Sequence, residues 1–175
     1  MSESIRPLRR DDVAAVVRLS LAAWAPVFRS FEEVLGPALY ARLYPDWTAS
    51  QAADVKRVCT EGKYTVWVAD ADGAVAGFVA YAPDAETKVG EVYMLAVDPA
   101  HQNRGLGTRL NALALDRLRE AGMTVAQVGT GGDPGHAPAR RTYEKAGYTA
   151  LPSVWYFKLL QPVERRAQNS LGRGG

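Results

Sequence analysis

The most informative stretch of the chain is Glu91-Val-Tyr-Met-Leu-Ala-Val97-Asp-Pro-Ala-His-Gln102-Asn-Arg104-Gly105-Leu-Gly107-Thr108. Its first seven residues are mainly apolar, which predicts a strand, and Asp98-Pro99 ends that strand. A polar loop then leads into an amphipathic helix expected over residues 105–121. The N–H groups at a helix start lack partners within the helix and lie at the positive end of its dipole. The stretch therefore predicts an anion site, to which Gly105 and Gly107 allow close approach and Arg104 adds positive charge.

Two familiar phosphate loops do not fit this stretch. A Walker loop needs Gly-Lys-Ser/Thr, whereas the second glycine is followed here by Thr108 and Arg109. A dinucleotide fingerprint needs a third glycine, whose place is taken by Leu110. The alternative is that both glycines only allow the helix to pack closely against the rest of the protein, without any ligand.

The composition excludes several classes of protein. The chain has 175 residues, which is the size of one domain, and its 21 basic and 19 acidic residues nearly cancel. This balance argues against nucleic acid as a partner. A single cysteine, Cys59, excludes an internal disulfide. Only His101 and His136 supply imidazole, so we expect no multi-histidine metal centre.

The sequence also predicts where the protein resides. We find no uninterrupted apolar run near the roughly 18 residues that a membrane span needs. The first residues lack the charged-then-apolar profile of a signal peptide. We therefore expect a soluble, cytoplasmic protein with no membrane partner.

The remaining patterns alternate between helix and strand. Helices are expected up to Pro26, over 31–44 with a break at Gly36-Pro37, and from Thr48, which with Gln51 has the form of a capping box. The other expected elements are strands at 5–9, 64–70, 74–81, 89–97, 124–130 and 155–160, and a helix at 137–146. Asp72-Gly73 predicts a hairpin between the expected strands 64–70 and 74–81. These elements predict one α/β domain over residues 1–160, followed by a flexible tail over residues 161–175.

Two motifs resemble the GNAT superfamily of N-acetyltransferases. The family signature is Gln/Arg-x-x-Gly-x-Gly/Ala after a strand that ends in a Leu-Ala-Val-like segment, and Gln102-Asn-Arg104-Gly105-Leu-Gly107 after Leu95-Ala96-Val97 matches it. The second match is Ala139-Arg-Arg-Thr-Tyr143-Glu-Lys-Ala-Gly147-Tyr148, which lies at the expected distance. The resemblance covers about residues 60–160.

The resemblance implies a fold and a reaction. The fold would be a mixed, mostly antiparallel sheet, flanked by helices and splayed near residues 91–97 and 124–130. The reaction would be direct transfer of an acetyl group from acetyl-CoA to a primary amine of a small molecule or peptide, without a metal. The residues implied in cofactor binding form the loop and the strand before it, together with two residues further on: Leu95, Ala96, Val97, Gln102, Asn103, Arg104, Gly105, Leu106, Gly107, Thr108, His136 and Tyr143.

Two residues match catalytic positions of the family. Tyr143 lies where a tyrosine commonly protonates the departing thiolate, and a phenol of pKa ~10 suits that role. The alternative is a tyrosine that only packs in the core. Glu91 lies where histone-type members have a general base, which would deprotonate the ammonium directly or through a water. The alternative is an ordinary strand residue.

His136 departs from the family pattern, which usually has a cofactor-binding asparagine there. A histidine can still donate one hydrogen bond. The preceding glycine-rich stretch, residues 129–135, either shapes the substrate pocket or is only a permissive turn.

Several questions stay open at this stage. A non-catalytic CoA-binding or regulatory module of the same fold is the main alternative to an enzyme. The acceptor amine and the length of the acyl group are not determined by the motifs. The oligomeric state is also open, with a homodimer as one outcome because homodimers are common in the family.

Overall fold

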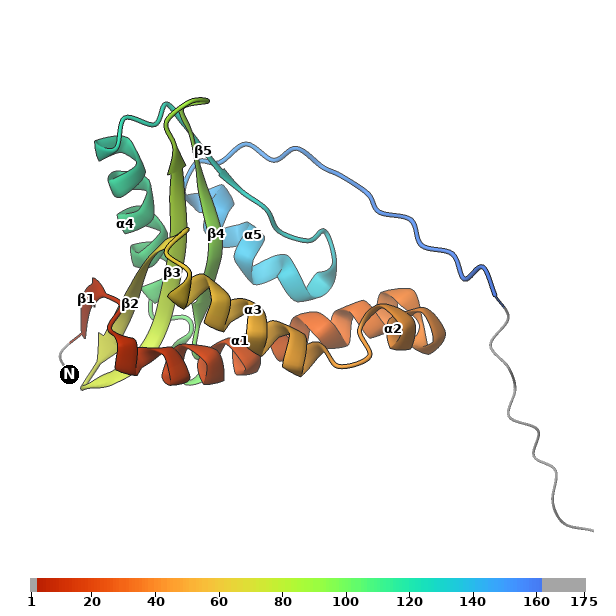
Figure 1. The fold of residues 1–175 in the computed structure, drawn as a ribbon. Helices are drawn as coiled ribbons and strands as arrows, with labels where there is room; N and C mark the ends of the chain where they lie inside the picture. The colour runs from red at the N-terminus through yellow and green to blue at the C-terminus, as the bar shows by residue number, and fades with distance from the viewer. Residues whose placement is uncertain (1–2, 162–175) are drawn as a thin grey trace, which may run out of the picture.

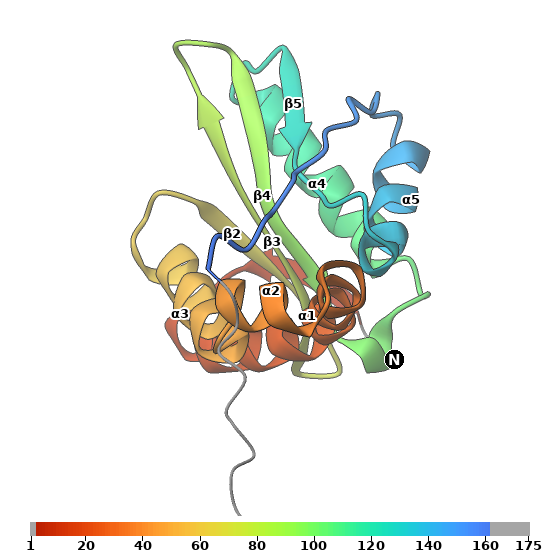
Figure 2. The same cartoon turned by 90° about the vertical axis from the view of Figure 1, so that its right-hand side faces the viewer.

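The computed structural model describes residues 3–161, which form one sheet with helices on both faces (Figures 1 and 2). The strands are β1 (Glu3–Pro7), β2 (Thr65–Ala71), β3 (Ala74–Asp84), β4 (Val89–Val97) and β5 (Val125–Val128). The helices are α1 (Val13–Leu35), α2 (Pro37–Leu43), α3 (Trp47–Thr60), α4 (Leu106–Glu120) and α5 (Ala137–Lys145). Short 3-10 turns are η1 (Arg10–Asp12), η2 (Pro99–His101) and η3 (Pro134–His136).

The strands lie in the sheet in the order in which they occur along the chain. Neighbours from β1 to β4 are antiparallel, and β5 runs parallel to β4. The hairpin between β2 and β3 turns at Asp72 and Gly73, whose φ angles of 52° and 86° are those of a type I′ turn. The expected single α/β domain with a mixed, mostly antiparallel sheet is confirmed.

The sheet opens in its middle, between β4 and β5. These strands pair only from Val89 to Val92 of β4, opposite Val125 to Val128 of β5, although β4 continues to Val97. The register between β3 and β4 shifts at the same place, which leaves Tyr93 as an extra residue in β4. Such a bulge bends and twists a strand, and it coincides with the expected splay.

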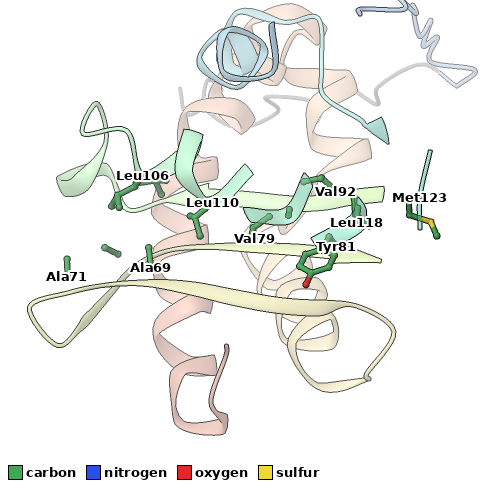
Figure 3. Close-up of a cluster of buried hydrophobic side chains, with 12 residues drawn as sticks. Ala69, Ala71, Val79, Tyr81, Val92, Leu106, Leu110, Leu118 and Met123 are labelled. Carbon is green, nitrogen blue, oxygen red and sulfur yellow. The ribbon is translucent and has the colours of Figure 1, made fainter. Parts of the chain in front are cut away.

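One face of the sheet is covered by α4. Leu106, Leu110 and Leu118 of this helix are at most 1% exposed and pack over the strands (Figure 3). Two glycines make this close approach possible. A Cβ at Gly90 would lie 2.5 Å from Cδ2 of Leu118, and one at Gly77 would lie 3.2 Å from Cδ1 of Leu110.

The other face of the sheet is covered by α1 and α3 (Figure 1). The side chains that meet there are buried and apolar: Val16, Leu19, Val55, Val58, Val68, Phe78, Met94 and Ala96. Each large aliphatic side chain buried in this way contributes roughly 1.5–3 kcal/mol to stability. The two apolar clusters hold the sheet between two helical layers.

The structure corrects two predictions in the N-terminal helices. The first helix does not end at Pro26 but continues to Leu35. An internal proline costs roughly 3 kcal/mol, which burial of Val27 and Phe28 beyond it helps to offset. The cap of α3 is not Thr48 but Asp46, whose Oδ1 accepts from the N–H of Ala49 at 2.9 Å and from the Thr48 hydroxyl at 2.8 Å.

The C-terminal part also departs from expectation. The strand expected at 124–130 is limited to Val125–Val128. Residues 155–160 were expected to close the sheet as a strand, but they form no regular element and extend away from it (Figure 1). A strand needs a neighbouring strand to satisfy its backbone, and nothing in residues 3–161 pairs with this segment. The expected tail, except for Gln161, lies outside the described residues.

One helical stretch is long and apolar. Arg10–Leu35 spans 26 residues with a mean hydropathy of 1.3, which meets the length and composition of a membrane span. Arg18 and Arg29 interrupt it, so it is not the uninterrupted apolar run that the sequence analysis looked for. In the structure, one side of α1 packs against α3, β3, β4 and η3, so we interpret it as a helix of the domain core.

We predict that Gly90→Ala destabilises the domain by about 1–3 kcal/mol, because the added methyl group overpacks against the buried Leu118. The matched control is Gly129→Ala, where a Cβ meets nothing within 4 Å. Urea unfolding of both variants measures the difference. Equal midpoints for the two variants would show that α4 is not held so closely.

Candidate functional site

The loop between β4 and α4 is held firmly at its start. The N–H of Asp98 donates to the carbonyl oxygen of Ala76 at 2.8 Å, and its carboxylate accepts from the N–H of Ala100 at 2.8 Å. The side-chain amide of Gln102 donates to the carbonyl oxygen of Val97 at 3.1 Å. Gln102 therefore fastens the loop to the end of β4.

The same loop leaves three backbone donors available at the start of α4. Arg109 donates the first helical hydrogen bond, to the carbonyl oxygen of Gly105 at 3.0 Å. The N–H groups of Leu106, Gly107 and Thr108 precede it and have no acceptor within the helix. Gly105 has a φ of 79°, which favours glycine, and the side chain of Leu106 is buried in the core. The geometry is that of an anion site.

Close packing does not explain the second glycine of the loop. A Cβ at Gly107 would lie 3.7 Å from Val97 and 3.8 Å from Leu95, which is ordinary van der Waals contact. Open access to the backbone is the remaining reason for a glycine at this position. Arg104 is exposed and forms no ion pair within residues 3–161, whereas Arg109 is paired with Glu3 at 2.7 Å.

The open edge of β4 ends at this anion site. Leu95, Ala96 and Val97 pair with β3 on one side, and no described strand pairs with them on the other side. Backbone groups on such an edge can bind an extended ligand as an added strand would bind. The structure thus brings together the open edge and the helix start that the sequence analysis singled out.

Tyr143 lies on α5 and is only 8% exposed. Burial raises the pKa of its phenol to about 12, with a smaller contribution from Tyr148. The two rings meet edge to face with centroids 5.7 Å apart, and the hydroxyl of Tyr148 donates to the buried Asn111 of α4 at 3.3 Å. Tyr143 is therefore a packed residue whose phenol keeps its proton at neutral pH. Asn111 had no signal in the sequence analysis.

His136 already has a hydrogen-bond partner through one of its ring nitrogens. Its Nδ1 is bonded to the carboxylate of Asp133. Burial raises the pKa of Asp133, but hydrogen bonds from His136 and Ser30 outweigh it, so the net shift is downward. Asp133 therefore orients the imidazole through Nδ1, and Nε2 remains for a further hydrogen bond. The cofactor contact that the resemblance implies for His136 stays a prediction.

The glycine-rich stretch 129–135 is not merely a permissive turn. None of its glycines has a positive φ. A Cβ at Gly135 would lie 2.8 Å from the Cα of Val27 and 2.9 Å from the Cβ of Ser30, so this glycine lets η3 dock against α1. Its N–H also donates to the hydroxyl of Ser30 at 3.1 Å. Arg140 completes the loop by donating to the carbonyl oxygens of Gly131 and Asp133.

Glu91 faces an open cavity on the side of the sheet away from α4. It lies between Ala82 of β3 and Gln127 of β5 and is half-buried. The cavity has a volume of about 650 Å³, which is within the range of small-molecule sites. Its charged lining consists of Lys63, Asp84 and Glu91. Hydrogen bonds from Thr87 and Glu86 hold the pKa of Asp84 below its usual range.

An aromatic cluster lies next to His136. The ring of Phe31 lies 5.6 Å from the imidazole and 5.4 Å from Tyr44, and Phe28 stacks on Trp47 at 4.3 Å. The cluster joins α1, the end of α2 and α3 to the loop that carries His136. The juxtaposition of this cluster with His136 depends on contacts between residues distant in sequence.

Two further residues behave as packing or capping groups. Cys59 is half-buried, and burial raises the pKa of its thiol to about 11. Asp46 caps α3. Within residues 3–161 no three His, Cys, Asp or Glu side chains are grouped as metal ligands.

Comparison with known proteins identifies the family. Residues 27–148 match the acetyltransferase (GNAT) family. Over 87 residues the chain is 45% identical to a mycothiol acetyltransferase of Sanguibacter keddieii; the match covers 47% of this chain and 27% of that protein. The chain therefore belongs to the acetyltransferase (GNAT) family, which confirms the resemblance. It spans about a quarter of the length of that relative.

Solved structures agree with the fold. An acetyltransferase of the same family from Desulfovibrio desulfuricans has a TM-score of 0.68 and 24% identity, covering 86% of this chain and 87% of its own. An N-acetyltransferase from Thermoplasma acidophilum, solved in complex with coenzyme A, has a TM-score of 0.64 and 16% identity. The match covers 88% of this chain and 94% of that protein. Both support the splayed α/β architecture.

We predict that Arg104→Ala weakens coenzyme A binding by roughly tenfold, since a hydrogen bond to a charged group contributes about 1.5–3 kcal/mol. Its matched control is Arg109→Ala, whose side chain is already paired with Glu3. Titration calorimetry at two salt concentrations measures both affinities. A loss of equal size in the two variants would contradict a specific role for Arg104.

Proposed function

We propose that this chain is an acetyl-CoA-dependent N-acetyltransferase that moves the acetyl group directly to a primary amine while both substrates are bound. The observation that supports this most is the open edge of β4, which ends at the free N–H groups of α4. This arrangement suits a ligand with an extended arm and a diphosphate. Family membership supports the same donor.

The chain's own residues have separable roles in this proposal. The N–H groups of Leu106, Gly107 and Thr108, with Arg104, hold the diphosphate. The backbone of Leu95–Val97 aligns the arm of the donor. Leu106 acts through its side chain, which seats the helix start in the core, and Gln102 and Asn103 shape the loop.

In the transfer step, the nitrogen of a neutral amine attacks the thioester carbonyl carbon. A carbon–nitrogen bond forms, the carbon–sulfur bond breaks, and the sulfur leaves as a thiolate that needs a proton. Tyr143 can give that proton because its pKa of about 12 keeps the phenol protonated at neutral pH. The amine loses one proton to a base, for which Glu91 is the first candidate.

The acceptor is proposed to be cationic before it reacts. The cavity at Glu91 has two carboxylates and one ammonium among its charged lining residues, which favours an ammonium group. Small amines, amino acids, polyamines, aminoglycosides and peptide amines all carry such an ammonium group before they react. We also propose a cytoplasmic location, which suits a chain with a single cysteine.

We expect thiol release from acetyl-CoA when the protein is given at least one member of a panel of such amines. The free thiol is measured with a chromogenic disulfide, and the acetylated amine by mass spectrometry. A thermal shift with coenzyme A, expected because a ligand that binds the folded state stabilises it, establishes binding first. Binding without thiol release from any amine of the panel would favour the non-catalytic module instead.

The same assay tests Tyr143. Tyr143→Phe is expected to lower kcat roughly 100-fold with little change in KM, because the phenyl ring preserves the packing and removes only the proton donor. The wild-type rate is expected to show no alkaline loss from Tyr143 up to about pH 11, since a group with pKa near 12 is still protonated there. An unchanged kcat would mean that Tyr143 only packs α5.

The identity of the base is tested by two matched variants. We expect Glu91→Gln to remove the decline in rate at low pH, because a base must be deprotonated to act and glutamine does not titrate. His136→Gln is the comparison, since Asp133 orients the imidazole with Nε2 free to accept a proton. If His136→Gln removes the decline and Glu91→Gln does not, the base is His136 and the amine binds beside the aromatic cluster.

A further inference from the structure

The cavity beside Glu91 is lined by charges of both signs. Lys63 lines it from the segment between α3 and β2, and Glu91 lines it from β4. The third charged residue of the lining is Asp84, at the end of β3. Its Oδ1 accepts from the N–H groups of Glu86 at 2.9 Å and Thr87 at 3.3 Å. Because Asp84 is engaged by the turn between β3 and β4, Lys63 and Glu91 are the charges left for a ligand.

Lys63 and Glu91 do not neutralise each other. Neither forms an ion pair within residues 3–161. In the sheet, β3 separates β2 from β4. Adjacent strands are about 4.8 Å apart, so side chains that start from β2 and β4 begin about 10 Å apart. Ala82 of β3, opposite Glu91 in the register, also lines the cavity and is too small to fill this distance.

An aromatic pair supports the ammonium group of Lys63. Its Nζ lies 4.9 Å from the ring centroid of Tyr64. Tyr64 is only 8% exposed and stacks on Tyr93 with the ring centroids 4.4 Å apart. A hydrogen bond with Tyr64 and, to a smaller extent, the negative charge of Glu91 raise the pKa of Lys63. Lys63 is therefore a cation at neutral pH, placed at the cavity by a ring that is itself packed.

The nearest arginine of α3 does not share this role. Arg57 is paired with Asp54 at 2.7 Å and with Glu61 at 3.8 Å, so its charge is balanced by its own helix and cap. It does not line the cavity. Among the described lining residues, Lys63 is the single cation. Attraction of a negative group into this cavity would therefore depend on one side chain.

We propose that the acceptor is a small zwitterion, a molecule that has both a primary amine and a carboxylate, as an amino acid does. The ammonium group lies at Glu91 and the carboxylate at Lys63. This inference rests on the proposed acetyl transfer at the same cavity and narrows its acceptor class. Lys63 is the specificity residue, because it attracts a carboxylate and repels the second ammonium group of a polyamine.

Matched acceptors test the contribution of the carboxylate. The pairs are alanine with ethylamine and phenylalanine with phenethylamine, since the members of each pair differ only by that group. We expect the wild type to have a kcat/KM roughly tenfold higher for the amino acid of at least one pair, because a hydrogen bond between charged groups is lost with the amine. The ratio of the two values within one variant cancels any general loss of active protein.

Variants of Lys63 decide whether this residue reads the carboxylate. Lys63→Met is expected to bring the ratio close to one, mainly by raising KM for the amino acid, and Lys63→Arg is expected to retain most of the preference. The matched control is Lys56→Met, which removes the same charge from an exposed position on α3 outside the cavity and leaves the ratio unchanged. The change between variants is the decisive quantity, because the two amines of a pair also differ in basicity. A ratio that Lys63→Met does not alter would overturn the proposal.

A binding measurement separates this inference from the proposed function. Titration calorimetry with the same acceptors uses protein saturated with coenzyme A, which has no acetyl group to transfer. We expect an amino acid to bind, and Lys63→Met but not Lys56→Met to weaken it roughly tenfold. If no amine releases thiol from acetyl-CoA, the proposed transfer fails, but this binding still tests the zwitterion site. Absence of binding by both amino acids, or equal binding of amino acid and amine, would overturn the inference while leaving acetyl transfer to another amine intact.

Discussion

The close approach of α4 to the sheet is the constraint on which the rest of the structure depends. Gly77 and Gly90 remove the side chains that would hold the helix off, and Leu110 and Leu118 occupy the space above them. Because the helix cannot move without opening this contact, its N-terminus is fixed at the end of β4. The proposed anion site is therefore built from backbone groups, and its position comes from apolar packing.

The second requirement is that β4 and β5 part after Val92. The bulge at Tyr93 bends β4 at this point, and the ring of Tyr93 is held by stacking on Tyr64 at 4.4 Å. Parting of the strands leaves the backbone of Leu95–Val97 open toward the side from which an extended donor would approach. Pairing and bulge together place Glu91 on the face of the sheet opposite α4, beside an open cavity. The bulge at Tyr93 thus lies between the proposed donor site at Leu95–Val97 and the proposed acceptor site at Glu91.

Much of the central region could be predicted from the sequence, because its signals act between near neighbours. The hairpin at Asp72-Gly73, the strand before Asp98-Pro99 and the helix after Gly105 all follow from local backbone preferences. Predictions that depended on distant contacts were less successful. Pro26 does not end α1, because burial against the sheet outweighs the local cost of proline. The hydrogen bond between His136 and Asp133 could not be predicted, because it depends on the docking of Gly135 against α1.

By itself, the sequence determined the class of fold, the loop that forms the anion site and the family to which the chain belongs. These depend on glycine positions, on apolar periodicity and on the order of short motifs, all of which can be recognised along the chain. Only the tertiary structure decided which glycines serve packing and which serve access, which face Glu91 occupies and what surrounds His136. It also decided that Val154–Phe157, although it has the composition of a strand, finds no partner within the described chain. The physical reason is that a strand is completed by hydrogen bonds to a neighbour, and the sequence of a segment does not say where that neighbour lies.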